Sequence, residues 1–269
     1  MNASSPPVVL TIAGSDCSAG AGIQADLKTF TRFHTFGLTA VTCVVSETPR
    51  TVRHVHPVPP AIVADQVRLL LDSYPVAAVK TGMLFSPEHI VAIAEVLSNR
   101  RIPLVVDPVM LASSGDSLMQ HSALAAYREF LLPLASVITP NLPEASVLLG
   151  RTVSTLADLE PAARELARLY QTHCLLKGGH LAAGIQRIDL LADPDGQIHR
   201  FAAPWIDSPA SHGTGCTLAA AIAAGLAHGQ PLLAAVAAAK QFISAAIAAG
   251  HSWTSGDGQP IHALNQNVS

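Results

Sequence analysis

Short apolar runs alternate with segments of helical periodicity along almost the whole chain, and this alternation constrains the fold more than any other feature. Strands are expected at residues 8–13, 39–45, 77–80, 104–106, 136–139 and 173–176. Helices are expected at residues 23–33, 61–71, 87–98, 123–131, 144–149 and 159–170. Continuous apolar strands separated by helices are typical of parallel strands that are covered on both faces. The pattern therefore predicts an α/β fold with a mostly parallel central sheet.

Two later segments depart from this alternation. Residues 187–191 and 198–202 flank the turn Asp193-Pro194-Asp195-Gly196, which predicts an antiparallel hairpin near an edge of the sheet. The Ala-rich segment 217–249 is apolar enough to raise the question of a membrane span, but Gly, Pro, His, Gln and Lys residues interrupt it. It is expected to form two buried helices instead.

Composition excludes several classes of partner. The chain has 269 residues, of which 49% are hydrophobic and 13% are charged, and this suits one large domain. A formal net charge of -3 argues against nucleic acid or a membrane as the main partner and favours a small-molecule ligand. The four cysteines form no CxxC pair, and no basic segment with an apolar core precedes the first strand. We expect reduced thiols and a cytoplasmic location.

Polar residues follow the predicted strands at their carboxyl ends. They are Asp16, Glu47, Asp107 and the segments 80–83, 139–141 and 177–180. Ligands bind beyond the carboxyl ends of the strands in open α/β sheets, so these residues are expected to surround one site.

The strongest local motif is the segment 211–217, Ser-His-Gly-Thr-Gly-Cys-Thr, which leads directly into the Ala-rich helix. Gly213, Thr214 and Gly215 let the backbone approach a ligand, and successive N–H groups at a helix N-terminus bind anions. Such a hole would stabilise a transferring phosphoryl group. The motif lacks the Lys-Ser/Thr pair of a Walker A loop, and a simple helix-capping turn is the alternative.

Cys216 lies in the first turn of the same helix. There the helix dipole and a neighbouring cation would lower the pKa of its thiol, which makes Cys216 a candidate acid/base group or ligand contact. A buried hydrophobic role is the alternative.

Three further side chains suit phosphate chemistry. Asp107 and Glu144 offer hard oxygen ligands for a phosphate-bound Mg²⁺, directly or through water, although either can also be a helix cap or a solvated charge. Lys177, beside a Gly-Gly turn, is a cation suited to a nucleotide phosphate, or else a surface lysine.

Seven motifs occur in the order of one known family: Thr11-Ile12-Ala13-Gly14-Ser15-Asp16, the segment 19–30, Lys80-Thr81-Gly82-Met83-Leu84, Val106-Asp107-Pro108-Val109-Met110, Thr139-Pro140-Asn141, Lys177-Gly178-Gly179-His180 and the segment 212–217. The chain resembles the hydroxymethylpyrimidine/phosphomethylpyrimidine kinases of thiamine biosynthesis, in the ribokinase-like superfamily. The resemblance implies a three-layer αβα sandwich, with a disordered tail at residues 1–7, a kinase domain at 8–254 and a C-terminal tail at 255–269.

The resemblance also implies site residues. The pyrimidine pocket would be lined by Gly14, Ala21, Asp26, Glu47, Met83 and Val109. The anion hole would be Gly213, Thr214, Gly215 and the amide of Cys216, and the nucleotide would contact Thr139, Asn141 and Lys177. Asp107 and Glu144 match the metal side. Many members of the superfamily carry an aspartate general base at the position of Cys216, so the thiol is expected either to act as the base or to position the reacting group.

One position departs from the family pattern. The family usually has Gln-Asn after the second strand, whereas this chain has Glu47-Thr48. An ionised Glu47 would offer acceptors only, where Gln offers both a donor and an acceptor to the aminopyrimidine edge. It would still accept from the exocyclic amine or bind a protonated ring nitrogen, or it would mark a different ring.

The implied reaction is ATP- and Mg²⁺-dependent phosphorylation of the hydroxymethyl group, followed by phosphorylation of the monophosphate, by a homodimer. Two alternatives stay open. A pyridoxal kinase shares the Gly-x-Gly-Cys anion hole and phosphorylates a hydroxymethylpyridine. The other alternative is a non-catalytic pyrimidine-binding protein, which would have kept the fold but not the kinase activity.

Overall fold

The computed structural model describes residues 5–110, 122–179 and 186–268, and its centre is a nine-stranded sheet. The strand order is β3-β2-β1-β4-β5-β6-β7-β8-β9. The strands are β1 (Val8–Asp16), β2 (Phe36–Thr48), β3 (Thr51–Pro57), β4 (Val76–Thr81), β5 (Leu104–Val106), β6 (Val137–Ile138), β7 (His173–Lys177), β8 (Gln186–Ala192) and β9 (Ile198–Pro204).

Six neighbouring strands of the sheet, in the order β2, β1, β4, β5, β6 and β7, are parallel. This confirms the predicted mostly parallel sheet. The predicted hairpin β8–β9 forms one antiparallel edge. At the opposite edge, β3 pairs antiparallel with β2, and this strand was not predicted from the sequence. This strand is mostly exposed and carries Arg53, His54 and His56, so it lacks the apolar pattern by which the other strands were recognised.

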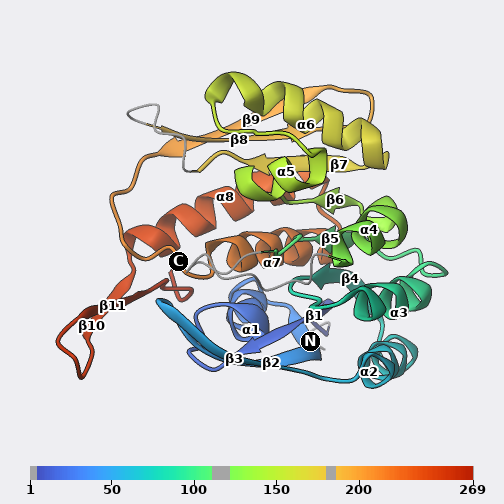
Figure 1. The fold of residues 1–269 in the computed structure, drawn as a ribbon, viewed down its shortest axis with the longest axis horizontal. Coiled ribbons are helices and arrows are strands. Elements are labelled where there is room, and N and C mark those ends of the chain that lie inside the picture. The colour runs from blue at the N-terminus through green and yellow to red at the C-terminus, as the bar shows by residue number, and fades with distance from the viewer. Residues whose placement is uncertain (1–4, 111–121, 180–185, 269) are drawn as a thin grey trace.

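Helices cover both faces of the sheet and give the three-layer sandwich (Figure 1). One layer contains α2 (Pro60–Ser73), α3 (Pro87–Leu97), α4 (Ala123–Ala126), α5 (Leu142–Leu149) and α6 (Leu156–Tyr170). The other contains α1 (Gly22–Arg32), α7 (Thr214–Ala227) and α8 (Leu232–Ala248). Successive strand residues face opposite layers, so Leu10 and Ile12 pack in the first core and Val9 packs in the second. The chain after α4 continues as a π-helical turn, Tyr127–Leu131, and a 3-10 turn, Leu132–Leu134.

The Ala-rich segment forms two helices, α7 and α8, as predicted. In the part of the chain that the structure describes, we find no helix with the length and apolarity that a membrane crossing requires. Alanine is short, so the two helices pack closely against the sheet and each other, with Ala219 to Ala224 completely buried.

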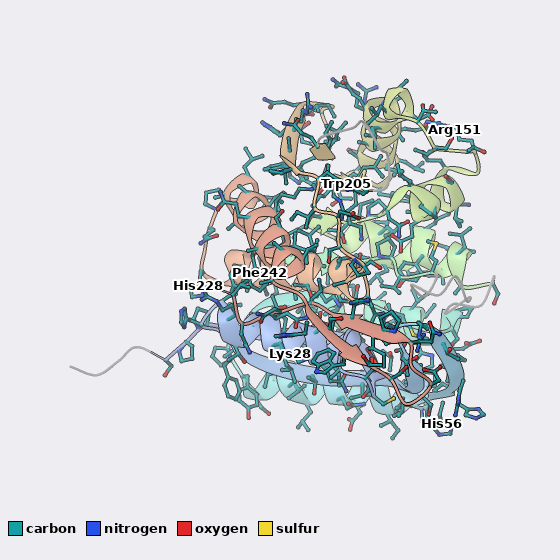
Figure 2. The ribbon with its side chains drawn as sticks, turned by 90° about the vertical axis from the view of Figure 1, so that its left-hand side faces the viewer. Lys28, His56, Arg151, Trp205, His228 and Phe242 are labelled. Carbon is teal, nitrogen blue, oxygen red and sulfur yellow. The ribbon has the colours of Figure 1, made fainter. Side chains whose placement is uncertain are left out.

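After α8 the chain forms a second, two-stranded sheet from β10 (His251–Thr254) and β11 (Pro260–Ala263), which projects from the body (Figures 1 and 2). The residues that follow β11 return to the second helical layer, where Leu264 is buried and Gln266 Nε2 donates to Thr217 Oγ1. The division into one domain and two tails stays a prediction, and residues 1–4 and 269 lie outside the described part.

Candidate functional site

A cavity of about 390 Å³ opens at the carboxyl ends of the parallel strands. Thirteen of the residues predicted for the site line it, together with residues that include His212, Gly22 and Val45. The predicted residues that line the cavity, all but the apolar pair discussed below, are Gly14, Ala21, Glu47, Asp107, Asn141, Glu144, Lys177, Gly213, Thr214, Gly215 and Cys216.

A second cavity of about 140 Å³ lies beside the first, between β7–β8 and α8. Its wall includes the apolar residues Leu218, Ile243 and Ile247 and the cations Arg187 and Lys240. Four residues line both cavities: Asn141, Lys177, Thr214 and Gly215. The two cavities therefore meet at the N-terminus of α7.

The start of α7 has the backbone geometry that the predicted anion hole requires. Gly213 adopts the left-handed conformation, with φ of 81°, and a Cβ there would overlap the carbonyl oxygen of Gly20. The N–H of Thr214 donates to Ser211 and that of Thr217 donates to Gly213. Within the described residues, the N–H groups of Gly215 and Cys216 have no acceptor, so both are available to an anion.

Asp107 and Lys177 face this hole. Lys177 Nζ lies 2.9 Å from Asp107 Oδ1, which also accepts a hydrogen bond from Thr139 at 2.9 Å. Burial acts against ionisation of Asp107, but Lys177 and Lys80 outweigh it and lower the pKa of the carboxyl. A Cβ on Gly215 would lie 3.3 Å from Lys177 Nζ and 3.5 Å from Asp107 Oδ2, so the glycine keeps both groups open to the junction of the cavities.

Glu144 and Asn141 form a capping box at the start of α5. Glu144 accepts from the Asn141 N–H at 2.7 Å, and Asn141 Oδ1 accepts from the Glu144 N–H at 2.8 Å. Burial, opposed by Lys177 and reinforced by Asp107, raises the pKa of Glu144 to about 7. Glu144 is therefore a helix-capping residue, which was one of the roles expected for it. The cap holds its carboxyl at the cavity wall.

The donor set fits a magnesium ion. Asp107 Oδ2 accepts no hydrogen bond from the described residues, and the buried Glu144 carboxyl is part of the same wall. Carboxylates and water are the ligands that Mg²⁺ prefers. Because Glu144 already accepts from backbone N–H groups of Asn141 and Met110, it suits a contact through water better than a direct one.

The expectation of a low thiol pKa for Cys216 is wrong. Burial raises the pKa of its thiol to about 11, although the nearby Lys80 lowers it. Asp26 and Asp107 add to the rise because their negative charges oppose a thiolate. Cys216 therefore carries its proton at neutral pH, and the helix dipole does not make it a thiolate here.

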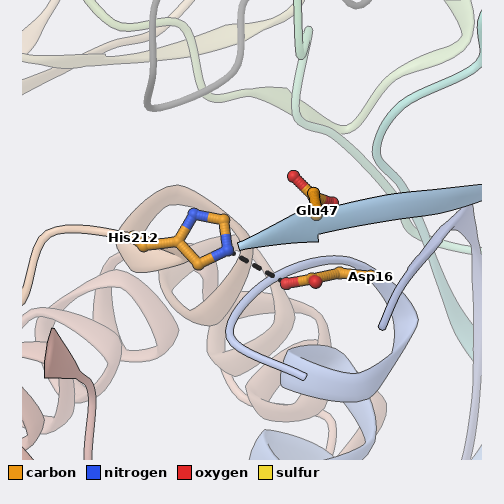
Figure 3. A group of neighbouring side chains, drawn as sticks. All are labelled: Asp16, Glu47 and His212. Atoms are coloured by element: carbon orange, nitrogen blue, oxygen red, sulfur yellow. Dashed lines mark hydrogen bonds and ion pairs between the residues drawn. The ribbon is translucent and has the colours of Figure 1, made fainter. Parts of the chain in front are cut away.

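Asp16 organises the small-residue loop and joins it to the anion hole. Its carboxylate accepts from the N–H groups of Ser18, Gly20 and Ala21, from Ser18 Oγ and from His212 Nε2 at 2.9 Å (Figure 3). These bonds outweigh the effect of burial and lower the pKa of Asp16. With so many donors on Asp16, the Asp16, Glu47 and His212 group serves structure better than metal binding. Asp16 was expected near the site because it directly follows a strand, but its role in holding the loop was not predicted.

Glu47 stands on β2 beside this group, half-buried in the wall of the larger cavity (Figure 3). Burial and the charge of Asp16 raise the pKa of its carboxyl to about 7, against a smaller opposite effect of His212. The assumption that Glu47 offers acceptors only therefore holds only above that pH. When protonated, its carboxyl offers one donor and one acceptor, as a glutamine side chain does.

The larger cavity also has an apolar part. Met83 and Val109 line it, as predicted, and pack with Cys43 and Val45 in a small separate cluster. An apolar wall with a few polar groups suits a methylated ring.

Two predicted site residues lie outside both cavities. Asp26 is completely buried below the floor of the larger cavity, where it pairs with Lys80 and accepts from Thr11. Thr139 is also completely buried and donates to Asp107. From these positions Asp26 acts on the site through its contact with Lys80, and Thr139 through its contact with Asp107. Asp189 and Lys240, which line the smaller cavity, were not predicted as site residues, because neither belongs to a recognisable sequence motif.

Comparisons with known proteins agree on the family of the chain. Residues 16–262 match the family model described as phosphomethylpyrimidine kinase. A hydroxymethylpyrimidine/phosphomethylpyrimidine kinase of Streptomyces coelicolor is 45% identical over 257 residues, which cover 96% of this chain and 94% of that protein. A thiamine biosynthesis bifunctional protein of Geobacter sulfurreducens is 49% identical over 95% of this chain, and the chain spans about half (52%) of its length.

Solved structures share the fold. A pyridoxal kinase of Bacillus subtilis, in complex with ADP, has a TM-score of 0.87 and 36% identity over 97% of this chain and 98% of its own. A pyridoxal kinase of Staphylococcus aureus with AMP-PCP and pyridoxal has a TM-score of 0.86, 35% identity and coverage of 97% and 94%. A phosphomethylpyrimidine kinase of Clostridium difficile has a TM-score of 0.77, 36% identity and coverage of 88% and 98%.

Proposed function

The chain belongs to the phosphomethylpyrimidine kinase family, and we propose that it phosphorylates the hydroxymethyl group of 4-amino-5-hydroxymethyl-2-methylpyrimidine and then the resulting monophosphate. ATP is the phosphoryl donor, and the product serves thiamine biosynthesis. One observation carries the proposal above the others: two cavities meet at a helix N-terminus whose N–H groups at Gly215 and Cys216 are open to an anion.

In this proposal the larger cavity holds the pyrimidine. Its ring packs against Met83 and Val109, and its aminopyrimidine edge faces Glu47. One proton lies between the Glu47 carboxyl and the ring: either the carboxyl is neutral, or it is ionised and the ring nitrogen is protonated. Both arrangements give a donor and an acceptor in complementary positions.

The smaller cavity holds the nucleotide, with its phosphates directed toward the four residues that the cavities share. The N–H groups of Gly215 and Cys216 and the ammonium of Lys177 would stabilise the charge on the transferring phosphoryl group. Asp107, and Glu144 through water, would hold Mg²⁺, which neutralises phosphate charge when bound. Asn141 stands between the cavities to orient the phosphate chain.

Cys216 positions the attacking hydroxyl and does not take its proton at the start of the reaction. A thiol with a pKa of about 11 is protonated at neutral pH and is available as a hydrogen-bond donor and weak acceptor. The transition state of phosphoryl transfer is loose, so the hydroxyl needs little deprotonation before the bond to phosphorus begins to form.

Pyridoxal phosphorylation is the second candidate. The solved structures with the higher TM-scores are pyridoxal kinases, and Glu47 departs from the usual glutamine. The sequence identities of 45% and 49% to proteins named for the pyrimidine pathway favour the first candidate. A non-catalytic pyrimidine-binding role is least supported, because Asp107, Glu144, Lys177 and the open N–H groups all border one junction.

The test is a coupled ATPase assay of hydroxymethylpyrimidine, its monophosphate and pyridoxal, with wild type beside Glu47→Gln. We expect both pyrimidines to be turned over and Glu47→Gln to shift the ratio of kcat/KM between pyrimidine and pyridoxal. A pyrimidine rate below about a hundredth of the pyridoxal rate, roughly 2.7 kcal/mol in transition-state stabilisation, would assign the chain to pyridoxal. Absence of turnover with all three, together with pyrimidine binding, would support the non-catalytic role.

The assembly and location of the protein also belong to this proposal. We expect a homodimer, which sedimentation velocity checks directly. Cytoplasmic location is supported by the four cysteines, all of which are free thiols in the structure.

A further inference from the structure

The smaller cavity contains more positive than negative side chains. Lys177, Arg187 and Lys240 line it, with Asp189 as the acidic residue of its own wall. Lys177 is paired with Asp107, and Lys240 lies 2.5 Å from Asp189. Asp189 also accepts the Gly178 N–H at 3.0 Å, which ties it to the turn after β7. Two of the three cations are thus neutralised within the protein.

Arg187 is the third cation, and it has no acid beside it. Among the described residues, its guanidinium has neither an ion pair nor a hydrogen bond, and its Nε is buried without an acceptor. A buried donor of a charged group without a partner is costly and rare in folded proteins. A ligand oxygen in the cavity would remove that cost.

The position of Arg187 is fixed by its neighbours. Arg187 and Asp189 are two residues apart on β8, so they face the same side of the sheet, toward α8. The guanidinium lies over the ring of Trp205, with Cζ 4.4 Å from the ring centroid. Trp205 belongs to the segment that follows β9 (Figure 2). In a cation–π pair on the open surface, water would hydrate the Nε of the arginine. Here the Nε of Arg187 is buried, and the side chain lines the cavity.

We propose that Arg187, held against Trp205, binds the nucleotide by donating hydrogen bonds to oxygens of its phosphate chain. This role rests on the proposed use of ATP and adds a residue that no sequence motif indicated. The planar guanidinium suits phosphate oxygens, and the apolar part of the wall at Leu218, Ile243 and Ile247 is left for the base.

The test measures dissociation constants of ADP and of adenosine by calorimetry for wild type, Arg187→Met and Arg187→Lys. Arg200→Met is the matched control, because it removes one exposed arginine from β9, opposite Leu190 on the other face of the same hairpin. We expect Arg187→Met to weaken ADP binding about tenfold or more and to leave adenosine binding unchanged. Arg187→Lys is expected to retain part of the ADP affinity, and Arg200→Met all of it.

Trp205 gives a second readout. The chain has two tryptophans, so Trp253→Phe leaves Trp205 as the single reporter beside Arg187. In that background ADP is expected to change the Trp205 emission, and the change is expected to shift to about tenfold higher ADP concentration with Arg187→Met.

Three results would overturn the role of Arg187: wild-type ADP affinity in Arg187→Met, equal losses for ADP and adenosine, or a similar loss in Arg200→Met. If the wild type binds no ADP, both this role and the proposed use of ATP fail. If it binds ADP with the expected dependence on Arg187 but phosphorylates neither pyrimidine, the proposed substrate is wrong and the role of Arg187 stands.

Discussion

Lys80 Nζ lies 2.8 Å from Asp26 Oδ2, and both side chains have no exposed surface. Asp26 is carried by α1 and Lys80 by β4, so the ion pair joins a helix to the centre of the sheet, near enough to Cys216 for both charges to act on its thiol. Thr11 Oγ1 adds a hydrogen bond to the carboxylate at 2.6 Å. The Asp26 carboxylate, in turn, raises the pKa of Lys80 against the effect of burial.

Asp26→Ala should therefore destabilise the fold rather than simply weaken substrate binding. It would leave the Lys80 ammonium buried without its partner, which costs about 3–5 kcal/mol in the free energy of unfolding. Urea unfolding measures this loss of stability in two proteins: the single variant Asp26→Ala and the double variant Asp26→Leu/Lys80→Met. The double variant should recover most of the loss, and a double variant as unstable as Asp26→Ala would show that the isolated charge is not the cause.

Glu47 should make pyrimidine binding depend on pH. Its pKa of about 7 means that the carboxyl loses its proton between about pH 6 and pH 8, and with it the donor that faces the ring. The KM for hydroxymethylpyrimidine is expected to rise over this interval in wild type. Glu47→Gln, which keeps a donor and an acceptor at all pH values, should show a flatter profile. Parallel profiles for the two proteins would remove Glu47 as the titrating group.

Cys216 should react slowly with alkylating agents at neutral pH. Because the thiolate is the nucleophile and the pKa is about 11, labelling at pH 7.5 is expected to be far slower than at the exposed Cys17. The rate should rise about tenfold for each pH unit up to that pKa. Peptide mass spectrometry follows both cysteines in one sample, and rapid labelling of Cys216 at pH 7.5 would reinstate the thiolate. Cys216→Ala should lower turnover more than Cys216→Ser, which keeps a hydrogen-bonding group.

Glu144 should show separable structural and chemical roles. Glu144→Ala removes the acceptor for the Asn141 N–H and is expected to cost about 1 kcal/mol in the free energy of unfolding. Glu144→Gln keeps a carbonyl acceptor, so its stability should stay close to that of wild type. Both variants are expected to require more Mg²⁺ for half-maximal turnover. Wild-type Mg²⁺ dependence in Glu144→Gln would restrict Glu144 to the helix cap.

The sheet and most of the site could be predicted because their sequence signals are local. Apolar runs revealed the buried strands, and the Gly-x-Gly-Cys segment indicated a loop that does line the larger cavity. β3 could not be found this way, because an exposed edge strand needs no apolar alternation. The start of α6 was placed three residues late, at residue 159, whereas Thr155 and Asp158 cap the helix ahead of that position.

Side-chain partnerships between distant segments were beyond the sequence. Asp26 matches a family motif, but only the packing of α1 on β4 shows that it faces Lys80 and not the cavity. The pKa values of Glu47 and Cys216 follow from burial and from charges on other strands, and neither can be read from the neighbouring residues. Asp189 is opposite Lys177 only because β7 and β8 pair in that register.

The four residues shared by the two cavities have a thermodynamic consequence. Asn141, Lys177, Thr214 and Gly215 line both cavities. In the proposed function they would face both ligands, so any ordering of them by the nucleotide would already be complete when the ring binds. By linkage, the factor by which ATP strengthens pyrimidine binding equals the factor by which the pyrimidine strengthens ATP binding. With both ligands bound as proposed, the common wall would make the phosphoryl donor and the acceptor bind cooperatively within a single protein chain, without any change in subunit arrangement.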